Sequence, residues 1–219
     1  MLPRHGNRSQ PARVWLRYKG RMAKRVRPAL IAGPILFLIG LIGLGVGFFA
    51  FKPAPVVQTT ASLVGGPFAL TDHEGKPLTD ADMKGKPFLV FFGFTHCPDI
   101  CPAKLFEISQ VLNIVEKDKP DISALFVSVD PERDTPEILK NYVSSFNPRI
   151  VGLTGDQASI DNVVKAYRAY AKKVPQEGGE YTMDHTSIVY LMNGKGEFVT
   201  SLDMSKRDTE VAQDILKAL

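Results

Sequence analysis

The sequence predicts an α/β fold in which a mainly parallel sheet is covered by helices. Two observations support this prediction. Continuous apolar runs at 88–94 and 122–129 have the length and composition of strands that are buried on both faces. A segment with apolar residues at helical spacing follows each run, so strands and helices alternate along the chain, as they do in α/β domains.

The first half of this domain is expected to begin with a short strand at 68–72 and a turn at 73–76. The buried strand at 88–94 comes next. It leads into a helix, because four apolar residues beyond the strand recur at helical spacing. These residues are Leu105, Ile108, Leu112 and Val115.

The second half continues the alternation. Thr135-Pro136-Glu137 combines a capping residue with proline at the first helical position, which predicts a helix up to about Phe146. A short strand is expected at 150–153. The helix after it is marked by Ile160, Val163, Val164 and Tyr167.

The last part of the chain is expected to close the sheet. The stretch 174–183 contains glycine and has no regular pattern, which predicts an irregular, mobile segment. Asn193-Gly194 separates strand-like segments at 186–192 and 197–202, which predicts an antiparallel hairpin, and a final helix holds Val211, Ile215 and Leu219. This order is the thioredoxin-like pattern with an additional strand and helix, as in peroxiredoxins.

The first 66 residues are expected to lie outside this domain, which spans 67–219. Residues 1–28 hold nine Lys or Arg and no acidic residue, whereas residues 29–51 carry no charge. As a helix this uncharged run would be about 35 Å long, enough to cross a bilayer. A cleaved signal peptide would have a shorter apolar core and a small-residue cleavage site. We therefore expect an uncleaved transmembrane helix, followed by a linker at 52–66.

The basic tail also predicts the orientation of this single anchor. Positive charge places residues 1–28 in the cytoplasm or matrix and the domain on the far side. We expect a bacterial inner membrane with the domain in the periplasm. The alternative is the mitochondrial inner membrane facing the intermembrane space. The rest of the chain is acidic and has no basic stripe with interleaved aromatic residues, so we expect no nucleic-acid partner.

Cys97 and Cys101 are the two cysteines of the chain, and they lie where the first long strand meets a helix. Residues four apart share one face of a helix, so both sulfurs can reach one metal ion or form a disulfide. A purely structural disulfide is disfavoured, because this bridge would close almost no loop. The start of a helix favours the thiolate, which is both the nucleophile and the metal ligand.

A third ligand has to be one of the four histidines. His5 lies in the basic tail, His73 is expected to be a solvated turn residue, and His96 is too close to Cys97 to aim at the same point. His185 directly precedes the strand at 186–192, where thioredoxin-like folds usually carry a cis-proline against the cysteine pair. We therefore expect His185 to reach the thiols.

Two thiolates and one imidazole form a soft ligand set. This set suits Cu(I), and with a fourth oxygen ligand it could hold Cu(II). Zinc with an open coordination position is the competing interpretation. Asp99 or Asp184 would then have to activate a water molecule.

Three segments resemble the signature of the Sco/SenC family: residues 92–102, residues 128–136 and Asp184-His185. The resemblance extends over roughly residues 60–219. It implies a membrane-tethered, thioredoxin-like copper protein that takes copper from an upstream donor protein. Such proteins help to assemble the CuA centre in subunit II of cytochrome c oxidase. The ligands that the resemblance implies are Cys97, Cys101 and His185.

Two functions from different classes stay open. In a metallochaperone, the acceptor's cysteines would displace Cys97 and Cys101 from copper stepwise. In a thiol–disulfide oxidoreductase, Cys97 would attack and Cys101 would resolve the mixed disulfide, keeping the CuA-site cysteines reduced. Peroxidase activity is disfavoured, because the residues before Cys97 lack the proline of the peroxiredoxin motif.

Overall fold

A computed structural model describes residues 63–119 and 121–219 of the chain. The predicted basic tail at 1–28, the predicted transmembrane helix at 29–51 and most of the predicted linker at 52–66 lie outside the described residues. Among the residues that are described, no helix combines the length and the apolar character that crossing a membrane requires.

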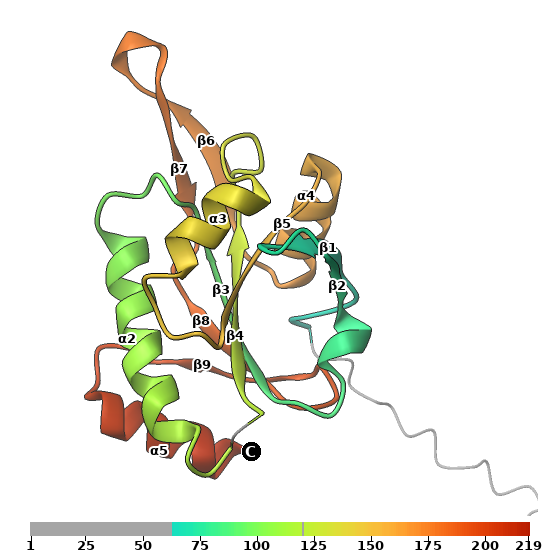
Figure 1. Cartoon of the computed structure of the whole chain (residues 1–219), viewed down its shortest axis with the longest axis vertical. Helices are drawn as coiled ribbons and strands as arrows, with labels where there is room; N and C mark the ends of the chain where they lie inside the picture. Colours follow the sequence, from blue (N-terminus) through green and yellow to red (C-terminus); the bar gives the residue numbers. More distant parts are fainter. Residues whose placement is uncertain (1–62, 120) are drawn as a thin grey trace, which may run out of the picture. The chain divides into compact units, whose positions relative to one another are not determined.

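Seven of the described strands form one sheet in the order β2-β1-β5-β4-β3-β8-β9 (Figure 1). The central strands β3, β4 and β5 pair in parallel, and the pairs on either side of them are antiparallel. The strands are β1 (Ala69–Asp72), β2 (Pro77–Thr79), β3 (Phe88–Gly93), β4 (Ser123–Ser128), β5 (Ile150–Thr154), β8 (Val189–Met192) and β9 (Phe198–Leu202).

A helix follows each of the three parallel strands, as the alternation predicts: α2 (Ile100–Val115), α3 (Pro136–Val143) and α4 (Gln157–Ala166). Helix α5 (Asp208–Ala218) follows β9, and there are short 3-10 helices η1 (Asp80–Met83) and η2 (Glu177–Gly179). The Thr135 side chain accepts a hydrogen bond from the Ile138 amide, and Pro136 is the first helical residue, which confirms the predicted start of α3. That helix ends at Val143, three residues before the predicted end.

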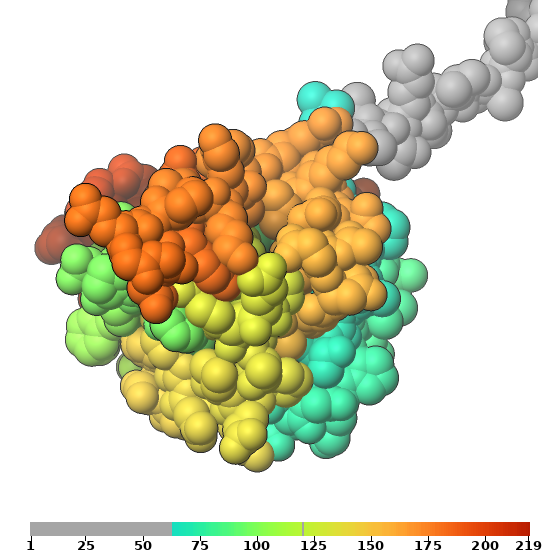
Figure 2. Space-filling view, turned by 90° about the horizontal axis from the view of Figure 1, so that it is seen from above, coloured from blue at the N-terminus to red at the C-terminus, as the bar shows by residue number. Residues whose placement is uncertain are grey.

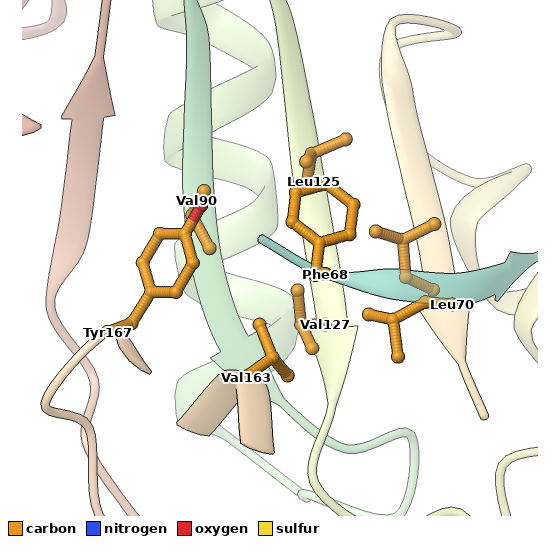
Figure 3. Close-up of a pocket in the computed structure, with 8 residues that line it drawn as sticks. Phe68, Leu70, Val90, Leu125, Val127, Val163 and Tyr167 are labelled. Atoms are coloured by element: carbon orange, nitrogen blue, oxygen red, sulfur yellow. The ribbon is translucent and has the colours of Figure 1, made fainter. Parts of the chain in front are cut away.

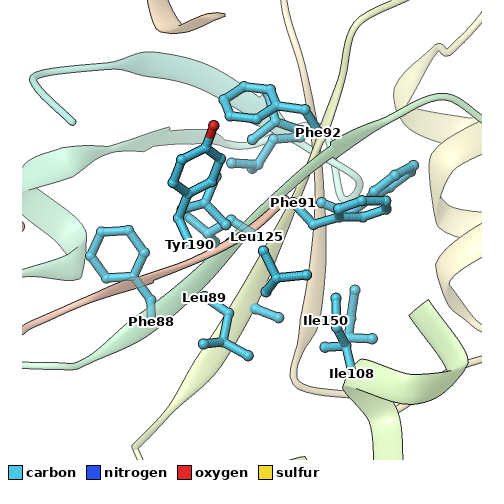
Figure 4. Packing of buried hydrophobic residues seen from close by; sticks show 14 of the residues in the cluster. Phe88, Leu89, Phe91, Phe92, Ile108, Leu125, Ile150 and Tyr190 are labelled. Atoms are coloured by element: carbon cyan, nitrogen blue, oxygen red, sulfur yellow. The ribbon is translucent and has the colours of Figure 1, made fainter. Parts of the chain in front are cut away.

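The core has two layers, because successive residues of a strand point to opposite faces of the sheet. Phe91 and Phe126 stack on the face that carries Tyr142 of α3, with 5.6 Å between the ring centroids of Phe126 and Tyr142. Phe92 points the other way and meets the ring of Tyr190 (Figure 4). It also meets the ring of Tyr167.

The second layer is closed by α4 and β1. Phe68 and Leu70 approach the β3–β4 face beside Val163 and Tyr167 (Figure 3). The pocket between them is lined by apolar side chains and the Tyr167 ring, so it belongs to the packing of the core.

The prediction that 174–183 is irregular is wrong. This stretch belongs to a two-stranded antiparallel ribbon of β6 (Ala171–Pro175) and β7 (Tyr181–His185), with η2 at its tip. The ribbon extends beyond the main sheet (Figure 1). Its residues are rich in Lys, Glu and Gly, so it shows no apolar alternation along the sequence.

The strand predicted at 186–192 is correspondingly shorter. His185 is the last residue of β7, and β8 begins at Val189, three residues later than predicted. The predicted hairpin is confirmed, because β8 and β9 pair around the turn at Asn193-Gly194. The thioredoxin-like α/β architecture is therefore confirmed, with His185 carried on a ribbon of its own rather than on the sheet.

Candidate metal centre

Three side chains meet at the carboxyl end of β3. One ligand atom each from Cys97, Cys101 and His185 can be chosen so that all three lie within 4.8 Å of one another. Among the described residues, no other group of three or more His, Cys, Asp or Glu side chains is placed to hold a metal ion. The structure thus brings together the three residues that the sequence singled out, and carboxylates take no part in the group.

The two cysteines differ in their surroundings. Cys97 lies in the loop between β3 and α2 and is half-buried, whereas Cys101 lies in the first turn of α2 and is fully buried. The Cys101 amide donates a hydrogen bond to the Cys97 sulfur over 3.4 Å, because it is one of the free N–H groups at the start of the helix. Burial raises the pKa of the Cys101 thiol, so the metal-free protein keeps its proton there at neutral pH.

Gly93 creates the space that the Cys101 sulfur occupies. A Cβ atom at this position would lie 2.9 Å from the Cys101 sulfur and 2.6 Å from Cε2 of Phe126. Any larger residue would therefore displace the sulfur or the ring. No motif in the sequence indicated this role of Gly93, although glycine at the end of a buried strand often marks a close approach.

His185 presents one ring nitrogen to the thiols. Its Nε2 atom lies 3.6 Å from the Cys101 sulfur, and its Nδ1 atom lies 3.1 Å from the carbonyl oxygen of Thr186. A carbonyl only accepts hydrogen bonds, so Nδ1 carries the proton and the lone pair of the neutral ring is on Nε2. A backbone partner of this kind orients a metal-binding histidine.

Two aromatic rings hold the imidazole in place. The ring of Phe94 meets it edge to face at 5.6 Å between centroids, and that of Phe91 does so at 6.5 Å. These contacts restrict rotation of the His185 side chain. The Nε2 atom of His185 is therefore oriented toward the thiols in the metal-free protein.

A buried carboxyl group supports the loop that carries Cys97. Asp134 is fully buried and accepts hydrogen bonds from the amide and hydroxyl groups of Thr95, at 3.0 and 2.6 Å, and from the Ser128 hydroxyl at 2.6 Å. It thus ties the segment after β4 to a residue two positions before Cys97. This segment is part of the 128–136 stretch that resembles the family signature, but its sequence did not indicate the contact with Thr95.

The remaining histidines lie elsewhere. His96 is exposed and, as expected, lies outside the three-residue group. His73 accepts a hydrogen bond from the Gly152 amide at 3.1 Å and has only 20% of its side chain exposed, so its interpretation as a solvated turn residue is wrong. The partner of His73 is a backbone amide of β5, which the sequence of the turn does not indicate. His5 is outside the described residues.

A pocket of about 260 Å³ opens onto the site. Cys97 and His185 are among its lining residues, together with Phe94 and Ile100, whereas Cys101 is not. Asp99 and Asp184 also line it, but they are not part of the ligand group. A partner molecule can therefore reach two of the three candidate ligands from solvent.

This difference in access predicts the order of thiol modification. With iodoacetamide at about pH 8, the reduced, metal-free chain should be alkylated at Cys97 long before Cys101, because Cys101 is buried and protonated. Peptide mass spectrometry after timed quenching measures the two rates. Equal labelling in the native protein would contradict the burial of Cys101, while equal labelling in urea serves as the control.

The donor set fits copper. Two sulfurs and one imidazole nitrogen, with no carboxylate in the group, are the soft ligands that Cu(I) prefers. The same three residues would also accept zinc with an open position. The geometry alone thus supports a site for a soft, low-coordinate metal ion.

Comparison with known proteins distinguishes these possibilities. The family model described as SCO1/SenC matches residues 56–219. The human mitochondrial SCO1 homologue is 46% identical over 156 residues, which are 70% of this chain and 52% of that protein. A SCO2-like protein of Rickettsia prowazekii (strain Madrid E) is 37% identical over 66% of this chain and 73% of its own length. The chain therefore spans about half the length of the human relative.

Two similar solved structures contain copper. That of Bradyrhizobium japonicum ScoI with copper bound is 54% identical, has a TM-score of 0.68, and covers 71% of this chain and 99% of that chain. The structure of yeast Sco1 with copper bound is 37% identical and has a TM-score of 0.66. The match covers 70% of this chain and 87% of that chain. The described domain is thus similar along nearly its whole length to proteins that hold copper.

Proposed function

Because the chain belongs to the SCO1/SenC family, we propose that it binds copper through Cys97, Cys101 and His185 and delivers it to the CuA centre of cytochrome c oxidase subunit II. The observation that carries this proposal is the convergence of three soft ligand atoms within 4.8 Å of one another. The copper bound to the similar ScoI protein of Bradyrhizobium japonicum supports the choice of metal.

The different burial of the ligands suggests how copper is held and released. Cys97 and His185 face the pocket, so ligands of an acceptor protein would replace them first. Cys101 would be the last contact, because it is fully buried. Its raised pKa favours return of a proton to the sulfur once copper leaves, which assists release.

The cellular setting completes the proposal. We place the domain outside the cytosol on a single N-terminal anchor at 29–51, oriented by the basic residues of 1–28. The periplasmic face of a bacterial inner membrane is our preferred location, with the mitochondrial intermembrane space as the alternative. In either compartment an upstream donor protein would supply the copper.

Copper transfer in vitro tests the proposal. The purified full-length chain, loaded with copper, is mixed with the metal-free CuA domain of subunit II. We expect the CuA absorbance to appear while this chain loses copper, and we expect Cys101→Ser to load and transfer much less. Copper that stays on this chain with no CuA absorbance, or Cys101→Ser transferring as wild type does, would contradict delivery through this site.

Thiol–disulfide exchange is a second candidate function, and it is favoured by one half-exposed sulfur beside one buried sulfur. The Cys97 thiolate would attack a disulfide of the acceptor and release one acceptor thiol. Cys101 would then attack the mixed disulfide, release the second thiol and leave a Cys97–Cys101 disulfide. In this case Cys101→Ser should trap the mixed disulfide, and His185 should be dispensable. Absence of a trapped adduct, with copper delivery intact, counts against this function.

A further inference from the structure

The residue that completes the metal centre is carried by a ribbon outside the main sheet. His185 ends β7, whose ladder partner is β6, with His185 opposite Ala171. Among the described strands, β6 and β7 pair with each other and not with the seven-stranded sheet. The position of His185 relative to the cysteines therefore depends on how the ribbon is fastened to the body.

Arg133 contacts β7 at Tyr181, the end of the strand that is farther from His185. Its Nε group donates to the Asp130 carboxylate, and its Nη1 group donates to the Tyr181 carbonyl oxygen over 3.1 Å. The guanidinium group also lies 3.7 Å from the centroid of the Tyr181 ring and 5.9 Å from that of Phe94. A cation this close to the face of an aromatic ring is attracted to it, and arginine can hold this position while its planar group donates hydrogen bonds.

Asp130 and Lys173 also hold the ribbon against the segment that follows β4. Asp130 is almost fully buried and accepts a hydrogen bond from the Tyr181 hydroxyl at 2.9 Å. Lys173 of β6 lies 3.8 Å from the centroid of the Tyr181 ring and pairs with Glu132 at 2.6 Å. Figure 2 shows the orange surface of the ribbon against the yellow-green surface of the segment that follows β4.

The same short segment also holds the cysteine side of the site. Asp134, one residue after Arg133, accepts two hydrogen bonds from Thr95 in the loop that carries Cys97. Residues 130–134 therefore contact both parts of the centre: the cysteine loop through Asp134, and the histidine strand through Asp130 and Arg133.

We infer that Arg133, paired with Asp130, is a positioning residue that sets the distance from His185 to the two thiols. Tyr181 and His185 are joined by one strand, so a shift at Tyr181 is passed along the strand to the imidazole. Without the guanidinium group, the buried Asp130 carboxylate would lose its cationic partner, and β7 would lose the hydrogen bond and the ring contact that Arg133 makes with Tyr181. This inference rests on the proposed copper site, but the fastening itself can be measured without metal.

The first test is Cu(II) binding by the full-length Arg133→Met variant. Supporting residues around metal ligands typically contribute about 10- to 100-fold to affinity, so we expect a loss of about tenfold and an altered Cu(II) EPR spectrum. Arg149→Met is the matched control, because it removes an arginine–carboxylate pair with Glu116 outside the site and should leave the affinity unchanged. In a His185→Ala background, Arg133→Met should cause no further loss, because the residue acts through His185.

A metal-free measurement separates this inference from the proposed function. Amide hydrogen exchange over 181–185 should be faster in Arg133→Met than in wild type, with exchange in α2 unchanged. If Arg133→Met does not fold, Tyr181→Phe, which removes the hydroxyl bonded to Asp130, should shift affinity and exchange in the same direction by a smaller factor. Failure of the wild-type chain to bind copper would sink the proposed function but leave the exchange test standing.

Three results would overturn the inference. One is wild-type Cu(II) affinity and spectrum in the folded Arg133→Met variant. Another is an equal loss of affinity when His185 is already alanine, since the effect would then not pass through His185. The third is unchanged exchange over 181–185 in Arg133→Met or, where that variant does not fold, in Tyr181→Phe.

Discussion

Cu(II) affinity should fall by about 100-fold or more in His185→Ala, a larger loss than supporting residues produce. The variant loses the proposed nitrogen ligand, whose lone pair faces the thiols, and keeps the two sulfurs. Cu(I), which two thiolates can hold, should be weakened less. Competition titration with a chelator of known affinity, together with EPR of the Cu(II) form, measures both effects on the full-length chain.

His73→Ala is the matched control for this experiment. It also removes a largely buried imidazole that makes one hydrogen bond, in this case with the Gly152 amide. His73 is not part of the ligand group, so its loss should leave both copper affinities near wild type. If His185→Ala binds Cu(II) as tightly as wild type does, His185 is not a ligand and the proposed three-residue site is wrong.

Asp134→Ala should destabilise the folded protein by about 3–5 kcal/mol. The change leaves three donors without their acceptor: the Thr95 amide, the Thr95 hydroxyl and the Ser128 hydroxyl. Each buried donor that loses its partner costs about 1–3 kcal/mol, and the sum is below the maximum because the loop can relax toward water. Urea unfolding followed by circular dichroism gives the free energy of unfolding.

Asp203→Ala provides the comparison for Asp134→Ala. Asp203 also accepts hydrogen bonds from an amide and a hydroxyl, both of Ser205, but this turn is exposed and water can replace the lost acceptor. The urea midpoint of the Asp203→Ala variant should therefore shift only slightly from that of wild type. If the two variants unfold at the same urea concentration, Asp134 does not have the structural role that its burial indicates. If the Asp134→Ala protein is stable and binds copper with unchanged affinity, Asp134 does not support the loop that carries Cys97.

The elements that could be predicted are those with a local pattern. The buried strands β3 and β4 were visible as apolar runs, α2 from the spacing of its apolar residues, and the start of α3 from Thr135-Pro136. Each of these signals acts within a few residues of the chain, through side-chain alternation, helical period or capping. The position of Cys101 in the first turn of α2 belongs to this group, whereas Cys97 lies in the loop before that helix, so the two cysteines do not share a helical face.

The ribbon that carries His185 had no such pattern. Its residues are half-exposed and polar, and what holds it is a set of contacts with residues distant in the sequence, chiefly those of Tyr181 with Asp130 and Arg133. Only the folded chain brings these residues together. For the same reason, the hydrogen bond from Gly152 to His73 could not be predicted from the sequence.

The sequence by itself determined the α/β order of elements, the position of the two thiols at the start of a helix, and the identity of His185 as the candidate third ligand. The tertiary structure decided how His185 reaches Cys101 across 84 residues, which ring nitrogen faces the sulfur, and why Gly93 must lack a side chain. It also decided that one segment, residues 130–134, supports both sides of the site. The physical reason is that spacing and capping act locally, whereas burial and hydrogen-bond partners are set by whichever distant segments pack together.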